Sequence, residues 1–266
     1  MEYIGALIGD FCGSIYEWSN TTQESPYDVE VLKNGKFTDD SVLTVSIMDW
    51  LNKTGGKETY NLPLFLRDWC NKYPNAGYGG RFKSWILSNK NEPIGSFGNG
   101  SGMRVSPCAY YANTLEECLD LAKKSAEVTH NHEEGIKGAQ AIAEAIYLAR
   151  SGAGKQDIGK VISEDFGYDL SKPLEEIGTK AHKFDATCQV TVPEALICFI
   201  NSEDFLDCIR KSIWIGGDSD TIAAMSASIA EAYYGIPHFI IEKVKEKLPK
   251  DMKETIIEFN KTMLIR

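Results

Sequence analysis

The sequence predicts an all-α fold, with about ten or more helices packed around one core. Apolar residues recur at helical spacing along most of the chain, and strand-like patterns are few. No Pro/Ser/Gly-rich linker, charge block or low-complexity tract interrupts the 266 residues, of which 43% are hydrophobic and 25% charged. We therefore expect a single domain over residues 1–266, long enough to bury a large core.

Two segments in the first half show helical spacing. The stretch SVLTVSIMDWL, from Ser41, places apolar residues at i, i+4, i+7 and i+8. Thr114 opens TLEECLDLAKKSAEV, and Glu117 follows three residues later, as in a capping box. The residues expected to face inward are Leu43, Ile47, Trp50 and Leu51 in the first segment and Leu115, Leu119, Ala122 and Ala126 in the second.

Two further helices are expected in the second half. EEGIKGAQAIAEAIYLAR predicts a long helix over 133–150, ended by Gly152. TIAAMSASIAEAYYG, after Asp220, is rich in Ala and Ser, so neighbouring backbones can approach it closely on several sides, and Gly235 and Pro237 are expected to end it. Its expected apolar face consists of Ile222, Met225, Ile229 and Tyr233.

Only two segments favour extended structure. QVTVPEALICFI has a β-branched start, but Pro193 followed by Glu-Ala-Leu is more typical of a helix entry. Residues 28–32 are the other candidate, for a small extended piece.

Charge and composition indicate which kinds of binding partner and which cellular location to expect. A net charge of −10 without a basic stripe argues against binding to a nucleic-acid backbone or sequence-specific readout. No basic leader opens the chain, and no segment approaches the ~18 apolar residues of a membrane span. The seven cysteines form no CxxC pair, which is typical of reduced core thiols in a cytoplasm. We expect a cytoplasmic monomer.

Two acidic clusters have the same layout: Thr38, Asp39 and Asp40 in FTDDSVL, and Asp218, Asp220 and Thr221 in IGGDSDTIAAM. Each opens an apolar helix, so either could be an ordinary N-cap, which gains ~0.3–1 kcal/mol from the helix dipole. One cap residue suffices for a helix, however, and adjacent carboxylates repel unless a cation or proton intervenes. Oxygen-only ligands suit Mg²⁺ or a similar hard cation, and no His/Cys spacing supports zinc.

The segment GSFGNGSGMR, from Gly95 to Arg104, is the candidate ligand loop. Its glycines would let backbone N–H groups approach a phosphate, but a plain flexible turn has the same composition. It lacks the GK[ST] ending of a P-loop. Arg104 could either face a phosphate or pair with an acid.

Three other side chains are candidate site residues because of their positions in the sequence alone. His130 and His132, in VTHNHEEG, lie at a helix junction, where such a pair is usually structural or solvated. Glu17 follows the first short helix; a glutamate there is normally surface, but the preceding glycine-containing turn leaves it free to reach a site.

Five stretches together resemble the ADP-ribosylglycohydrolases, the group that includes the dinitrogenase-reductase-activating glycohydrolases. They are GALIGDFCGSIYE, FTDDS, GSFGNGSGMRVSP, THNHEEGIKGA and IGGDSDTIAAMSASIAEAYYG, in that order, and the resemblance covers almost the whole chain. It implies a compact, single-domain orthogonal helical bundle and hydrolysis of the bond between C1 of the distal ribose and a modified target.

The resemblance also implies a set of site residues. Two Mg²⁺ ions, or Mn²⁺, would be bound by Thr38, Asp39, Asp40, Asp218, Asp220 and Thr221. The ADP-ribose moiety of the target would be held by Gly95, Ser96, Phe97, Gly98, Asn99, Gly100 and His130. Glu17 would gate the metal site or meet the scissile sugar, and Asp40 or Asp218 would take the proton of the attacking water.

Two alternatives stay open at this point. One is a phosphoester hydrolase that uses the same binuclear metal site, and the other is a catalytically inactive ADP-ribose-binding module. Arginine, serine, ester and nucleobase linkages are all conceivable, because no stretch identifies the group that carries the ADP-ribose.

Overall fold

The computed structural model describes residues 2–18, 35–57, 59–88, 90–178 and 184–265. Across these ranges the chain forms fifteen α-helices and one short 3-10 helix but no strand, which confirms the all-α prediction. A single isolated antiparallel bridge joins Gly98 and Thr187. The candidate extended piece at 28–32 lies outside the described residues.

The helices are α1 (Gly5–Gly13), α2 (Asp39–Thr54), α3 (Leu62–Lys72), α4 (Gly80–Ser88), α5 (Gly100–Met103), α6 (Ser106–Tyr111), α7 (Leu115–Glu127), α8 (Glu133–Arg150), α9 (Lys155–Phe166), α10 (Leu174–Ile177), α11 (Cys188–Ile200), α12 (Phe205–Ile215), α13 (Ser219–Tyr234), α14 (His238–Lys247) and α15 (Lys250–Ile265), with the 3-10 turn at Thr59–Asn61.

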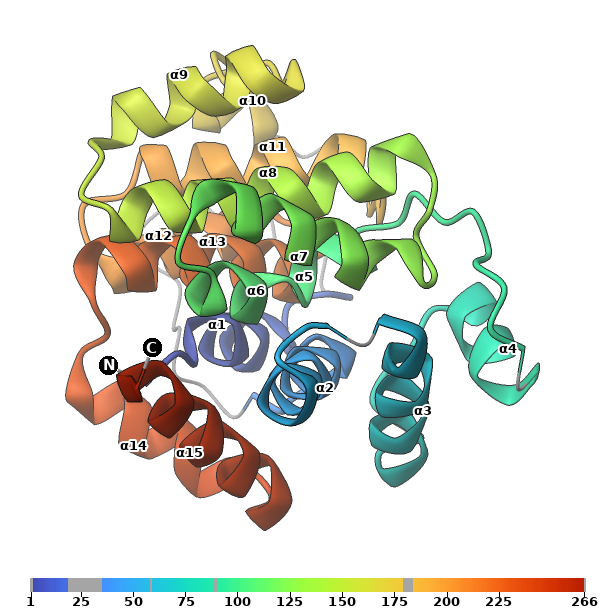
Figure 1. Ribbon diagram of the computed structural model, residues 1–266. Coiled ribbons are helices and arrows are strands. Elements are labelled where there is room, and N and C mark those ends of the chain that lie inside the picture. The colour runs from blue at the N-terminus through green and yellow to red at the C-terminus, as the bar shows by residue number, and fades with distance from the viewer. Residues whose placement is uncertain (1, 19–34, 58, 89, 179–183, 266) are drawn as a thin grey trace.

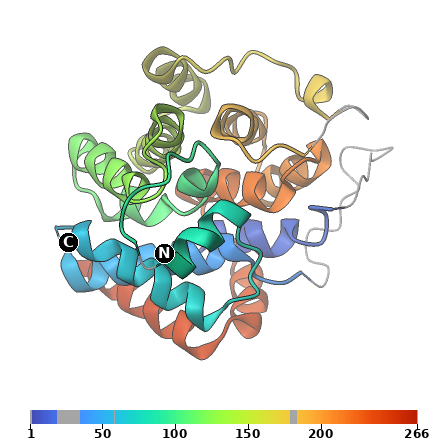
Figure 2. The same ribbon diagram turned by 90° about the vertical axis from the view of Figure 1, so that its right-hand side faces the viewer.

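Helix α13 lies at the centre of the molecule (Figure 1). It packs against α1, α8, α11 and α12, while α9 and α10 cover α8 and α11 on one side. On the other side α2 packs against α3 and α15, and α14 and α15 lie near both chain ends. Figure 2 turns α3 and α4 toward the viewer, with the connection from α4 to α5 running across that face.

Helices α1 and α13 pack closely, because glycines in α1 face the backbone of α13. A Cβ added at Gly9 would lie 2.1 Å from the carbonyl oxygen of Ala223, and one at Gly5 would lie 2.6 Å from that of Ala227. The predicted close backbone approach is therefore confirmed. Residues 219–231 of α13 are all buried, so this helix has no single apolar face, and Tyr233 near its end is 37% exposed.

Two local predictions need correction. In α7, Thr114 accepts from the backbone N–H of Glu117 as expected, but Leu115 and Leu119 are only half-buried. The buried face is centred on Cys118 and Ala122, because α8 packs there and the Cys118 thiol donates to the carbonyl of Ala143. The inward stripe is therefore rotated from the predicted one.

The second correction concerns α11, which begins at Cys188, so that Pro193 lies inside the helix rather than at its entry. A proline there leaves the carbonyl of Gln189 without its helical donor. Gln189 is exposed, so water can take the place of that donor near the helix start.

The predicted position of the cysteines in the core is confirmed. All seven cysteines are buried and free of disulfides. Within the described ranges, every helix is too short or too polar to cross a bilayer.

Candidate active site

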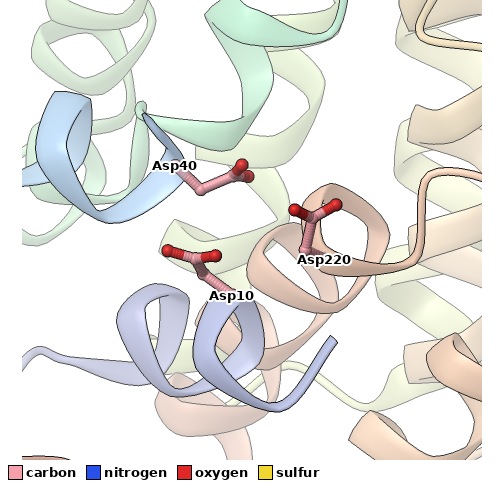
Figure 3. Close-up of side chains that lie close together, drawn as sticks. All are labelled: Asp10, Asp40 and Asp220. Atoms are coloured by element: carbon pink, nitrogen blue, oxygen red, sulfur yellow. The ribbon is translucent and has the colours of Figure 1, made fainter. Parts of the chain in front are cut away.

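The two predicted acidic clusters meet in space, although 177 residues of sequence lie between them. Thr38 is the N-cap of α2 and Asp218 that of α13, so both clusters open their helices as predicted. The hydroxyl of Thr221 lies 3.3 Å from Oδ2 of Asp40, and it can donate a hydrogen bond across the two helix starts. Figure 3 shows Asp40, Asp220 and a third carboxylate, Asp10 of α1, directed toward one another from three helices.

These acids form two adjoining groups that share one residue. In each group, one oxygen per residue lies within 4.8 Å of the others: Asp10, Asp40 and Asp220 make the first group, and Glu17, Asp218 and Asp220 make the second. Asp220 is thus common to both. Such an arrangement has the geometry needed to hold one cation, or two neighbouring cations.

Asp10 has a part in the site that the sequence analysis missed. Its carboxylate accepts from the backbone N–H of Thr38 at 2.8 Å and of Ser41 at 3.0 Å, and from both hydroxyls of these residues. Asp10 therefore fixes the start of α2 and, with it, the direction of Asp40. The available signal was a lone acid inside the apolar helix GALIGDFCG.

Burial raises the pKa of every acid in the cluster, and repulsion between carboxylates adds to the rise for all of them except Asp10. Burial is the largest cause for Asp40 and Asp220, followed by neighbouring carboxylates, and both pKa values lie well above the usual range. Burial also raises the pKa of Asp218 to about 6 and that of Glu17 to about 7. Oδ1 of Asp40 is buried without a hydrogen-bond partner within the described residues. So many carboxylates need protons or cations to offset their charge.

A cavity of about 410 Å³ opens beside the acids. Asp39, only half-buried, lies in its wall, and Oδ1 of Asp39 would be 3.1 Å from a Cβ placed at Gly77. The predicted site residues that line the cavity are Glu17, Asp39, Asp40, Ser96, Gly98, Asn99, Gly100, His130, Asp218, Asp220 and Thr221. Thr38 lies behind Asp40, and Gly95 and Phe97 are outside the lining set.

The loop that leads into α5 is held in place, unlike a plain flexible turn. The amide of Asn99 donates to Oδ2 of Asp218 at 2.7 Å, which ties the loop to the acidic cluster. The backbone N–H of Asn99 donates to Ala186, and the N–H of Cys188 donates to Phe97. The loop and the acids are therefore joined in one wall of the cavity.

A second glycine segment and an aromatic pair also line the cavity, and the sequence analysis singled out neither. Gly79 and Gly80 leave open space, since an added Cβ would meet no atom within 4 Å, and the segment NAGYGGR was the available signal. At the rim, the rings of Trp18 and Phe184 are stacked with centroids 5.0 Å apart. Trp18 is 77% exposed, so the rim presents an aromatic surface next to Glu17.

The two histidines have different environments. His130 is buried in the cavity wall, whereas His132 is the N-cap of α8 and its Nδ1 accepts from the backbone N–H of Glu134 at 3.2 Å. Arg104 is also buried, and it pairs with no acid of the described chain. Its Nη2 donates instead to the carbonyl of Ser125 and to the hydroxyl of Thr129.

The sequence profile of the ADP-ribosylglycohydrolase family matches residues 3–265. The chain belongs to the ADP-ribosylglycohydrolase family. The protein named ADP-ribosylhydrolase ARH3 from Mus musculus is 24% identical over 97% of this chain and 87% of its own length. The ADP-ribosylarginine hydrolase Tri1 of Pseudomonas putida (strain GB-1) is also 24% identical, over 91% of this chain and 72% of its own length.

A solved structure titled "ADP-ribosylglycohydrolase-related protein complex" has the same fold, with a TM-score of 0.72 and 21% identity over 98% of this chain and 96% of that one. Membership of the ADP-ribosylglycohydrolase family supports hydrolase activity toward ADP-ribosyl groups. The five stretches that carry the resemblance all contribute residues to this cavity or to the elements behind it.

Proposed function

We propose that this protein is a Mg²⁺-dependent hydrolase that releases ADP-ribose from a modified target by cleaving the glycosidic bond at C1 of the distal ribose. The observation that carries the proposal is the pair of acidic groups sharing Asp220, placed against a glycine-lined cavity in a member of this family. An acidic protein needs such local features to hold an anionic ligand.

The residues present fit a divalent metal centre. The donors are all oxygens, and Oδ1 of Asp40 lacks a partner among the described residues. Burial, followed by repulsion from neighbouring carboxylates, raises the pKa of Asp40. Oxygen donors favour Mg²⁺, with Mn²⁺ as the other candidate. The proposed ligands are Thr38, Asp39, Asp40, Asp218, Asp220 and Thr221. Bound there, the ions would supply charge compensation and orient the ribose hydroxyls and a water molecule.

The chain's own residues would then bind, orient and transfer protons. The loop from Ser96 to Gly100 would hold the diphosphate, with His130 beside it. The N–H groups of Ser96, Gly98 and Asn99 already donate within the described residues, so the backbone donors for the phosphates would be those of Phe97 and Gly100. The bond at C1 breaks through an oxocarbenium-like transition state. Asp40 or Asp218 would take the water proton as general base, and Glu17, at the rim, would meet the scissile sugar.

The target side of the bond would lie near the rim formed by Trp18 and Phe184, because Glu17 and Trp18 are consecutive and both line the cavity. Which linkage is cleaved is a matter for experiment, since the two relatives cited above are named for different hydrolases.

Incubation with a panel of ADP-ribosylated substrates tests this function. Peptides modified on arginine or serine, acetyl esters and nucleobase adducts would be treated with Mg²⁺ or with excess chelator, and the products identified by mass spectrometry. We expect intact ADP-ribose from at least one linkage, only with Mg²⁺. Robust release in excess chelator would refute the metal mechanism. Phosphate release would favour the phosphoester hydrolase, and tight binding of ADP-ribose without turnover would favour the binding module.

A further inference from the structure

His130 is linked to a fully buried arginine through the hydroxyl of its neighbour. Oγ1 of Thr129 lies 2.7 Å from Nδ1 of His130, and Nη2 of Arg104 lies 3.0 Å from the same Oγ1. Arg104 and Thr129 have no exposed surface, and His130 is 5% exposed. The three side chains therefore form a fixed chain of hydrogen bonds behind the cavity wall.

The direction of these hydrogen bonds follows from the protons that each group carries. A guanidinium has donors only, so the bond from Arg104 makes Oγ1 of Thr129 an acceptor. The single hydroxyl proton of Thr129 is then free to point at Nδ1 of His130. In the opposite tautomer Nδ1 would carry the proton, and the buried hydroxyl would have no acceptor in the described chain, at a cost of roughly 1–3 kcal/mol. Nδ1 is therefore the acceptor.

The remaining ring nitrogen faces the ligand loop. A Cβ placed at Gly100 would lie 3.1 Å from Nε2 of His130, and one at Gly98 would lie 3.7 Å from it. No protein group within the described ranges bonds Nε2, and His130 lines the cavity. Burial lowers the pKa of His130 well below its usual value, and the positive charges of Arg104 and Arg81 add to this effect. The imidazole is therefore neutral at physiological pH.

We propose that Arg104 and Thr129 are positioning residues that hold His130 as the neutral Nε2–H tautomer, so that it donates a hydrogen bond to an oxygen of the bound ADP-ribose. The identity of the ligand rests on the proposed function, whereas the tautomer does not. In this form His130 contributes a donor at a cavity wall rich in carboxylates. The opposite tautomer would direct a lone pair at a phosphate oxygen, which has no proton to donate, and would oppose binding there.

A purely structural role is the competing explanation, because Nη2 of Arg104 also donates to the carbonyl of Ser125 in the last turn of α7. That role would affect stability but would not require one tautomer of His130. The tautomer is therefore the decisive readout.

Nitrogen-15 NMR of the imidazole rings measures the tautomer directly. The chain has four histidines, and His130→Gln assigns the relevant pair of signals. We expect a protonated Nε2 and an unprotonated Nδ1 across neutral pH in the wild type. Thr129→Val should convert this pattern to a tautomer mixture, and Thr129→Ser should restore it. A protonated Nδ1 in the wild type, or an unchanged pattern in folded Thr129→Val, would overturn the proposal.

Calorimetric titration with ADP-ribose tests the consequence. Thr129→Val should weaken binding by roughly tenfold, the equivalent of one lost donor, and raise KM more than it lowers kcat. Thr129→Ser should bind like the wild type. Thr191→Val is the matched control, since Thr191 is equally buried and its hydroxyl donates only to the carbonyl of Thr187, the N-cap of its own helix. Equal losses in the two valine variants would support the structural explanation, and wild-type protein that binds no ADP-ribose would refute the proposed function while leaving the NMR result decisive.

Discussion

Asp218 connects the acidic cluster to the ligand loop. It accepts from the amide of Asn99 and belongs to the group with Glu17 and Asp220. An asparagine at this position keeps an oxygen that can accept from Asn99 but loses the negative charge. Asp218→Asn therefore tests the negative charge of the carboxylate while it keeps an acceptor for the hydrogen bond from Asn99.

We expect Asp218→Asn to lower turnover at least ~100-fold while the protein stays folded, because a metal ligand or general base is lost. Asp39→Ala should likewise remove turnover. Hydrolysis rates and circular dichroism check both, with Asp157→Asn as the control, since Asp157 is exposed on α9. Full activity in either site variant would exclude that residue from the proposed site.

Individual residues were predictable where their side-chain chemistry was unusual for their position. Pairs of acids beside a threonine at the starts of apolar helices indicated Asp40 and Asp218. Asp10 was missed because a lone acid in a helix gives no clue to its partners, which come from residues 38 and 41. The contact of Phe184 with Trp18 at the rim could not be predicted from local sequence, because 165 residues separate the two and only the folded chain brings them together.

At the level of elements, the α1–α13 contact positions both acidic groups. α1 carries Asp10, α13 carries Asp220, and the glycines of α1 allow the two backbones to touch. Glu231 of α13 also accepts from the N–H groups of Ile4 and Gly5, so it fixes the start of α1.

Gly9→Ala should separate these helices, because its Cβ would overlap the backbone of Ala223. We expect a loss of roughly 3 kcal/mol in the free energy of unfolding, measured by urea denaturation, and a loss of Mg²⁺ affinity. Gly80→Ala is the control, since an added Cβ meets nothing within 4 Å, and it should change stability by less than ~0.5 kcal/mol. Equal stability of the two variants would contradict the role given to this contact.

Helices with a strong periodic pattern were predicted well. Features of a helix that depend on the helices or solvent around it, such as its buried face or its first residue, were not. The range of α8 matched the prediction of 133–150 because the 18-residue pattern ends at a glycine. The face of α7 was predicted only in part: Ala122 and Ala126 are buried as expected, but Leu115 and Leu119 are only half-buried, because the depth of burial depends on where α8 lies. The start of α11 was wrong because solvent at Gln189 tolerates an internal proline, which local sequence rules do not reveal.

For the whole molecule, the buried acids make stability depend on pH and on metal together. A carboxyl group whose folded pKa is raised stabilises the fold below its unfolded pKa, and that stability is lost as pH rises through the folded pKa. For Asp218 and Glu17 these folded values are about 6 and about 7. The metal-free protein should thus become less stable as pH rises across this window.

Thermal unfolding in chelator should therefore give a higher Tm near about pH 5 than near about pH 8. Added Mg²⁺ should raise Tm more at the higher pH, because metal binding requires deprotonated carboxylates. Glu231, whose pKa burial raises to about 7, adds to the pH slope but lies outside both acidic groups, so it contributes nothing to the Mg²⁺ response. A Tm that does not change with Mg²⁺ at any pH would count against the metal centre.

The cytoplasmic location and the monomeric state stay predictions.

The most direct test of the central claim is a crystal structure of the protein grown with Mn²⁺, with anomalous scattering used to locate the metal. The account predicts anomalous peaks between the starts of α2 and α13, bound by Asp40, Asp218 and Asp220, and loss of at least one peak in Asp218→Asn. Well-ordered carboxylates with no peak between them at saturating Mn²⁺ would contradict it.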